Sequence, residues 1–294
     1  MSTFARDFRR MMYKNYVLCG LSAIVVAVLF SCSGKNKPVT DVDDLYRQDS
    51  IESASDTLNL VPEDDGLSKS VDELFDDFFI AFVTNQKFQM QRIKFPLQCN
   101  DADVASAIKR EDWETHNKFT AYDIFSVIYE DEEDILIKND TSVRQVAIEW
   151  IDLQTDSAEI YTFKKADGEW YLRTLNKTSV EDMTNGDFLE FFSHFSNDSI
   201  FQAQSIDNPL RIITSDDIEG EGDTAVLEVN ANEWNDIKND YPLPTREIVN
   251  IDYGQPSGSL RYKQVLMQNM NNSMFIKLRF HKYSTEWKLI EIEE

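Results

Sequence analysis

The chain contains one stretch of sequence twice, and this repetition restricts its architecture more than any other feature. FDDFFIAFVTNQKFQMQRIKFPL (Phe75–Leu97) aligns without a gap to FLEFFSHFSNDSIFQAQSIDNPL (Phe188–Leu210), 113 positions later. Ten aligned positions are identical, and five of these are phenylalanine. A second matching pair, DGEWYLRTL (Asp167–Leu175) and STEWKLIEI (Ser284–Ile292), closes each copy. Because this period has the size of a small domain rather than of a solenoid unit, we predict two tandem domains, residues 70–179 and 183–294.

Each predicted domain begins with a helix. In the first copy, apolar residues from Val71 to Phe82 recur at the i, i+3, i+4, i+7 spacing of one helical face, and Asp72 lies on the opposite, exposed face. Ser70 and Glu73 match a capping box, which predicts that the helix starts there.

A second helix and a run of strands follow. The second helix is predicted over Gln86–Lys94, closed by Pro96. Further along, Val146–Leu153 and Phe275–Tyr283 alternate apolar and polar residues with the period of two that is typical of strands. Helices followed by strands predict an α+β fold in which the N-terminal helices of each domain pack in a curved antiparallel sheet.

The composition is globular and strongly acidic. Hydrophobic residues make up 42% of the chain, and 19 phenylalanines are enough to build two cores. The formal net charge is −24, which repels phosphate backbones, so we expect no nucleic-acid partner. The acidity itself is interpreted as a source of solubility.

The N-terminus is predicted to be a targeting segment. Lys14 precedes an apolar run over Val17–Phe30, which is shorter than a membrane-spanning helix. LFSC (Leu29–Cys32) resembles a lipobox, so we predict a lipoprotein signal peptide over residues 1–31 and lipidation of Cys32. An uncleaved membrane anchor is the alternative. The mature start lacks acidic residues directly after the cysteine, which favours a lipid-anchored, periplasm-facing location in the cell envelope.

The remaining thiol and the region before the domains have no catalytic pattern. Residues 32–69 are rich in Asp, Ser and Thr without an apolar period, and are predicted to be an acidic flexible spacer. Cys99 is the one cysteine of the mature chain outside the lipidation site. Its counterpart in the second copy is Ile212, so we interpret Cys99 as a buried small hydrophobe rather than a nucleophile.

These residues together resemble a known fold family. The Phe-rich helices, the FPL stop, the strand series and the closing DGEWYL and TEWKL look like the nuclear-transport-factor-2-like (NTF2-like) cone, a curved sheet wrapped round helices. Duplicated in an acidic lipoprotein, the chain resembles the Bacteroidetes lipoproteins of family DUF4348, from about Ser70 to its end. Catalysis in NTF2-like enzymes usually rests on Asp, His or Tyr groups inside the cone, and no such set matches here. DSI and DTL resemble the O-glycosylation sequon of these bacteria, which implies modification at Ser50 and Thr57.

Among the histidines, His194 is the candidate for catalysis. It lies among the phenylalanines of the second copy's opening helix, and a general base there would use Asp198, one turn on, as its orienter. The favoured interpretation is a histidine at the border of the helix face. His116 and His281 lie in polar surroundings, and no two histidines have metal-ligand spacing.

Two acidic stretches contain carboxylates close enough in sequence to suggest cation sites. DIEGEGDTAVLE places carboxylates in the order of a calcium loop, at Asp217, Glu219, Glu221, Asp223 and Glu228. Since TAVLEV indicates a strand rather than an exiting helix, a hairpin turn is the favoured interpretation. EDEED (Glu130–Asp134) is predicted to be a solvated loop.

The functional prediction is therefore a class rather than a reaction. The sequence contains no phosphate-cradling glycine loop, nucleophile elbow or HExxH motif, and we expect no cofactor. The favoured hypothesis is a non-catalytic lipoprotein that binds a small molecule or an envelope protein. The alternatives are a hydrolase or isomerase that uses one cone, and a structural protein whose cones are filled by their own side chains.

Overall fold

The computed structural model describes residues 71–101, 104–119, 124–216, 223–258, 261–269 and 275–294, so the predicted signal peptide and spacer lie outside it. We call residues 71–179 the first half and residues 183–294 the second half. Within the described ranges, no helix is both long enough and apolar enough to cross a membrane.

The described residues of the first half form helices, 3-10 helices and strands. In chain order these are α3 (Phe75–Thr84), α4 (Gln86–Gln91), β1 (Ile93–Asp101), β2 (Val104–Ile108), η1 (Arg110–Asp112), α5 (Trp113–His116), β3 (Ile124–Tyr129), η3 (Asp134–Asn139), β4 (Gln145–Asp152), β5 (Ser157–Ala166) and β6 (Glu169–Ser179).

The second half contributes a closely similar order of elements. These are α6 (Gly186–Asn197), α7 (Ser199–Gln204), β7 (Ile206–Asp216), β8 (Asp223–Val229), α8 (Trp234–Ile237), η4 (Lys238–Asp240), β9 (Glu247–Asp252), β10 (Tyr262–Asn269), β11 (Phe275–Tyr283) and β12 (Glu286–Glu293).

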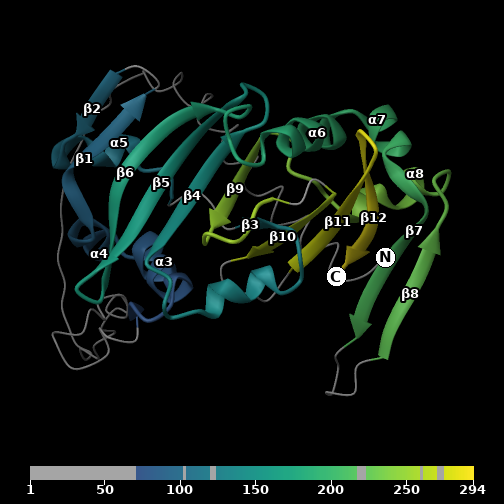
Figure 1. The fold of residues 1–294 in the computed structure, drawn as a ribbon, viewed down its shortest axis with the longest axis horizontal. Coiled ribbons are helices and arrows are strands. Elements are labelled where there is room, and N and C mark those ends of the chain that lie inside the picture. Colours follow the sequence, from purple (N-terminus) through teal and green to yellow (C-terminus); the bar gives the residue numbers. More distant parts are fainter. Residues whose placement is uncertain (1–70, 102–103, 120–123, 217–222, 259–260, 270–274) are drawn as a thin grey trace, which may run out of the picture.

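All of these strands join in one twelve-stranded sheet, with the order β2-β1-β6-β5-β4-β9-β3-β10-β11-β12-β7-β8 (Figure 1). The order is the same from either end if each strand is replaced by its counterpart, and this symmetry includes the strands at the centre. There β9 of the second half pairs with β4 of the first, and β3 of the first half pairs with β10 of the second. Each half is thus completed by a strand from the other. The two halves share one sheet, so the structure does not separate them into the predicted tandem domains. The division at residues 70–179 and 183–294 stays a prediction.

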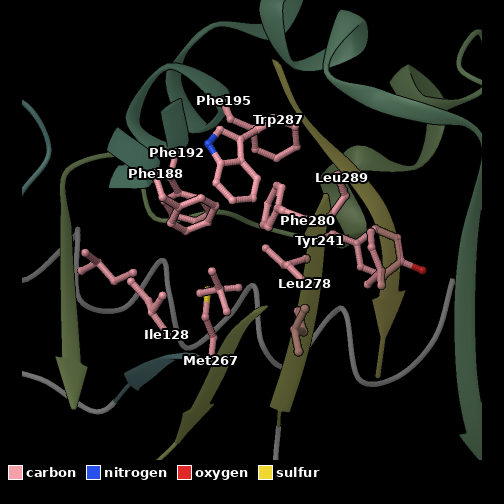
Figure 2. Close-up of a cluster of buried hydrophobic side chains, with 14 of the residues drawn as sticks. Ile128, Phe188, Phe192, Phe195, Tyr241, Met267, Leu278, Phe280, Trp287 and Leu289 are labelled. Atoms are coloured by element: carbon pink, nitrogen blue, oxygen red, sulfur yellow. The ribbon is translucent and has the colours of Figure 1, made fainter. Parts of the chain in front are cut away.

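Two hydrophobic cores lie on opposite faces of this sheet. On β3, Ile124 and Ile128 belong to the core beneath α6, whereas the intervening Phe125 and Val127 belong to the core beneath α3. Adjacent residues of a strand point to opposite faces, so α3 and α6 cover opposite faces. Figure 2 shows the α6 core, in which Ile128 from the first half lies with Met267, Phe280 and Trp287. Neither core is built from one half alone.

The seam between the halves also carries polar contacts. Asn250 on β9 donates to the Glu149 carboxylate at 2.7 Å and accepts from the backbone N–H of Ile128 at 2.8 Å. Nearby, the Lys263 ammonium lies 2.6 Å from the Glu130 carboxylate, and both side chains are buried. These bonds satisfy polar groups that the shared sheet removes from water.

The predicted α+β fold class and two predicted strands are confirmed. The sheet is mixed rather than antiparallel, because β1 pairs with β6, β7 with β12, and β3 with β9 in parallel. The Phe275–Tyr283 strand has the predicted bounds, and β4 lies within one residue of the prediction at each end. The antiparallel pairing of β7 with β8 is the hairpin predicted at the calcium-like stretch.

Both helix predictions in the first copy need correction at one end. Helix α3 begins at Phe75 rather than near Ser70, because Asp72 is drawn inward to an ion pair with Arg92 instead of lying on an exposed helical face. Helix α4 ends at Gln91, and Pro96 lies within strand β1, preceded by a cis peptide bond. The helix therefore ends before the proline is reached.

The acidic run Glu130–Asp134 is also not simply a solvated loop. Glu130 is buried and forms an ion pair with the buried Lys263. The Glu132 carboxylate bonds to Lys277 and Arg279 on β11. These two carboxylates tie the end of β3 to the strands of the second half.

Candidate functional site

A concavity of the second half lies over the outer flank of α6. Phe188, Phe192 and Phe195 of α6 are buried in the core, at the spacing of one helical face (Figure 2). Phe191 and His194 lie off this face and border a hollow of about 510 Å³. This volume is within the range of about 300–1,000 Å³ that is usual for ligand sites.

The floor of the hollow is aromatic. Phe191 from α6, Phe201 from α7 and Trp287 from β12 line it. The rings of Phe191 and Phe201 lie 5.8 Å apart, and Phe191 also contacts Trp287 at 6.4 Å. Trp287 is buried, whereas the two phenylalanines are partly exposed. A floor of this kind offers faces on which flat or cationic groups stack.

The rim carries charges of both signs. Lys282 lies 2.8 Å from the Asp187 carboxylate, and its ammonium lies 5.3 Å above the Trp287 ring. The remaining charged or titratable lining residues are Glu190, His194, Glu286 and Lys288. The arrangement can hold a ligand by stacking and by ion pairs at the rim.

His194 is at this rim, but Asp198 does not orient it. The Asp198 carboxylate accepts from the backbone N–H groups of Ile200 and Phe201 and thereby caps α7, and these bonds lower the pKa of Asp198. The His194 ring instead packs on Phe201, with the centroids 5.8 Å apart. The acid–base pair considered from the sequence is not assembled in this geometry.

The other candidates lie elsewhere or outside the described residues. Cys32, Ser50 and Thr57 lie outside them, as do Asp217, Glu219 and Glu221. Asp223 and Glu228 are on strand β8, where Glu228 is exposed.

The remaining thiol and histidines are placed as follows. Cys99 is buried on β1, which confirms its interpretation as a core residue. The His281 ring stacks on Tyr262 at 4.4 Å and meets the Tyr283 ring edge-on at 4.2 Å. His116 ends α5, and its side chain is outside the description.

A partly buried acid lies beside a tyrosine, and the sequence does not predict this contact. The Tyr253 hydroxyl donates to the Asp76 carboxylate at 2.5 Å, and burial raises the pKa of both groups. The adjoining cavity measures only about 30 Å³, which is room for about one water molecule. No local pattern connects positions 76 and 253, because the contact depends on β9 joining the first half. Because the adjoining cavity is too small for a ligand, we interpret the pair of Asp76 and Tyr253 as a structural contact.

Comparison with known proteins identifies a family and a fold. Residues 54–294 match the family described as a domain of unknown function, DUF4348. The structure is similar to the crystal structure of an NTF2-like protein from Bacteroides fragilis, with 32% sequence identity and a TM-score of 0.67. The match covers 76% of this chain and 96% of that one. The search of curated proteins finds no match.

Proposed function

We propose, from the premise that the chain belongs to the DUF4348 family and has an NTF2-like fold, that it is a non-catalytic binding protein of the cell envelope. The observation that carries the proposal is the hollow over α6, which joins an aromatic floor to a charged rim. Binding is favoured over catalysis because the rim histidine packs on Phe201 and the nearest candidate orienter, Asp198, caps a helix. General acid–base catalysis requires positioned partners within hydrogen-bond reach.

Removing the Phe201 ring tests this proposal. Ligand-observed NMR of the full chain against a library of small metabolites and peptides should identify ligands that Phe201→Ala binds at least about tenfold more weakly, since stacking area is lost. Phe88 is the aligned residue of the first half, so Phe88→Ala is the matched control and should leave the affinity unchanged. Equal affinities for wild type and Phe201→Ala would refute the site. Turnover of a ligand that ceases in His194→Ala would favour an enzyme instead.

We also propose that Cys32 carries a lipid that tethers the protein to the membrane, with the chain facing the periplasm. Support comes from the LFSC sequence after the apolar run. In cells, Cys32→Ser is expected to abolish metabolic labelling by an alkyne fatty acid and to move the protein out of the membrane fraction, because the acylated thiol is lost. Ser31→Ala, which leaves the thiol, is the control. Continued labelling of Cys32→Ser would contradict the proposal.

A further inference from the structure

The first half shows what fills the place that is hollow in the second. Arg92 and Ser205 occupy equivalent positions, each following the second helix of its half. The Arg92 carbonyl accepts from Leu172 N–H at 2.8 Å, and the Ser205 carbonyl accepts from Leu289 N–H at 2.8 Å. The two backbones are therefore aligned by the same contact to the closing strand, and only the side chains differ.

Arg92 covers the aromatic floor of its own half. Its guanidinium forms two hydrogen bonds to the Asp72 carboxylate, at 2.8 and 2.9 Å, and a longer one to Glu169 at 3.3 Å. It lies 4.7 Å from the centroid of the Phe88 ring and 5.6 Å from that of Tyr171. The site in the first half is thus a guanidinium site that the chain satisfies internally.

The second half keeps the aromatic floor and lacks the guanidinium. Phe201 and Trp287 correspond to Phe88 and Trp170, and Glu286 corresponds to Glu169. Ser205 is buried and lines the hollow. Its side chain is too short to reach across the hollow.

The carboxylates around the hollow match a missing cation. Within the described part of the chain, Glu190 and Glu286 form no ion pair, whereas Glu169 meets Arg92 in the first half. The whole chain has a formal net charge of −24, which attracts basic partners. The hollow therefore lacks the flat cation that its counterpart holds.

Resting on the proposed function of this hollow, we infer that it binds an arginine side chain presented by a peptide or protein partner. The guanidinium stacks on Phe201 as Arg92 stacks on Phe88. It pairs with Glu286, the counterpart of the more distant carboxylate partner of Arg92, whereas the closer partner, Asp72, aligns with Asn185. Arginine is favoured over lysine because a planar guanidinium stacks and forms paired hydrogen bonds, which a compact ammonium does not.

Isothermal titration of the full chain with Nα-acetyl-arginine amide tests the inference. We expect saturable binding, and at least about tenfold weaker binding of the citrulline analogue, which has the same shape without the charge. Ser205→Arg should abolish binding because its own guanidinium fills the hollow, whereas Ser205→Ala should bind like wild type. Glu286→Gln provides a second variant that does not depend on refilling the hollow, and should weaken binding about fivefold or more with an unchanged unfolding temperature.

Three outcomes would overturn the inference: no saturable binding of the arginine probe, equal affinity for citrulline, or retained binding in a folded Ser205→Arg protein. Its failure is distinguishable from that of the proposed function. If the arginine probe fails while another ligand binds in a Phe201-dependent manner, the hollow is a binding site for a different chemistry. If no ligand depends on Phe201, both proposals fail.

Discussion

Replacing Arg92 with methionine is expected to lower the free energy of unfolding by about 3–5 kcal/mol, because it leaves a buried carboxylate without its cation. The two side chains of the Arg92–Asp72 pair are only 8% and 3% exposed. Asp72 also accepts from the backbone N–H of Trp170 at 2.9 Å, so the pair joins the start of α3 to strand β6. Urea denaturation of the full chain, followed by tryptophan fluorescence, measures the change.

Two comparisons make this result specific to the buried pair. Lys282→Ala removes the more exposed Lys282–Asp187 pair at the rim of the hollow in the second half, and should cost at most about 1 kcal/mol. The double variant Asp72→Asn/Arg92→Met should regain part of the loss, because no uncompensated charge is buried. A loss below about 1 kcal/mol in Arg92→Met would show that Asp72 finds another partner or reaches water.

The same ion pair explains where the helix prediction succeeded and where it did not. The i, i+3, i+4 spacing correctly identified Phe75, Phe78 and Phe82 as buried, because amphipathic spacing reports on the nearest packed face. It misplaced the start of the helix, because Asp72 is held by a partner twenty residues away along the chain. A local pattern contains no information about such a partner.

The predictions for the strands also succeeded in part and failed in part. Strand β11 was predicted from its alternation, since one face packs on the core. Strand β3 is buried at every position, so its sequence predicts burial on both faces but not which strands flank it. The exchange of β3 and β9 between the halves is set by packing across the whole molecule. Contacts that depend on this exchange, such as the one between Asp76 and Tyr253, could therefore not be predicted from the sequence.

The candidate site was predictable in part. His194 was correctly located at the edge of the α6 face, because its neighbours set that face. The hollow itself results from a difference between the copies, Arg92 in one and Ser205 in the other, and the ungapped alignment contains that difference. The alignment does not show what this difference does, because the Arg92 side chain is held by Glu169 on β6 and by Asp72, which both lie far from Arg92 along the chain.

The seam between the halves has a partly buried acid that should make stability depend on pH. Burial raises the pKa of Glu149 to about 7, the Asn250 hydrogen bond opposes the rise, and the charge of Asp252 adds to it. Glu149 is on β4 and Asn250 on β9, so the bond joins the two halves. A carboxyl whose folded pKa exceeds its ordinary value of 4.5 stabilises the fold fully at low pH. That contribution is lost as the pH rises through about 7.

Glu149→Gln should therefore stabilise the protein at pH 8 by up to about 3 kcal/mol relative to wild type, and change it little at pH 4.5, since each pKa unit is worth about 1.4 kcal/mol. The glutamine carbonyl can still accept from Asn250. Urea denaturation at both pH values measures the difference. Glu159 on β5 is the control of opposite sign: burial favours a higher pKa, but bonds from Lys118 and Tyr161 prevail and lower it. Glu159→Gln should therefore weaken the fold at pH 8 and matter less as the pH falls through the lowered pKa of Glu159. If Glu149→Gln destabilised the protein equally at both pH values, Glu149 would be ionised in the fold and the seam would hold a charge.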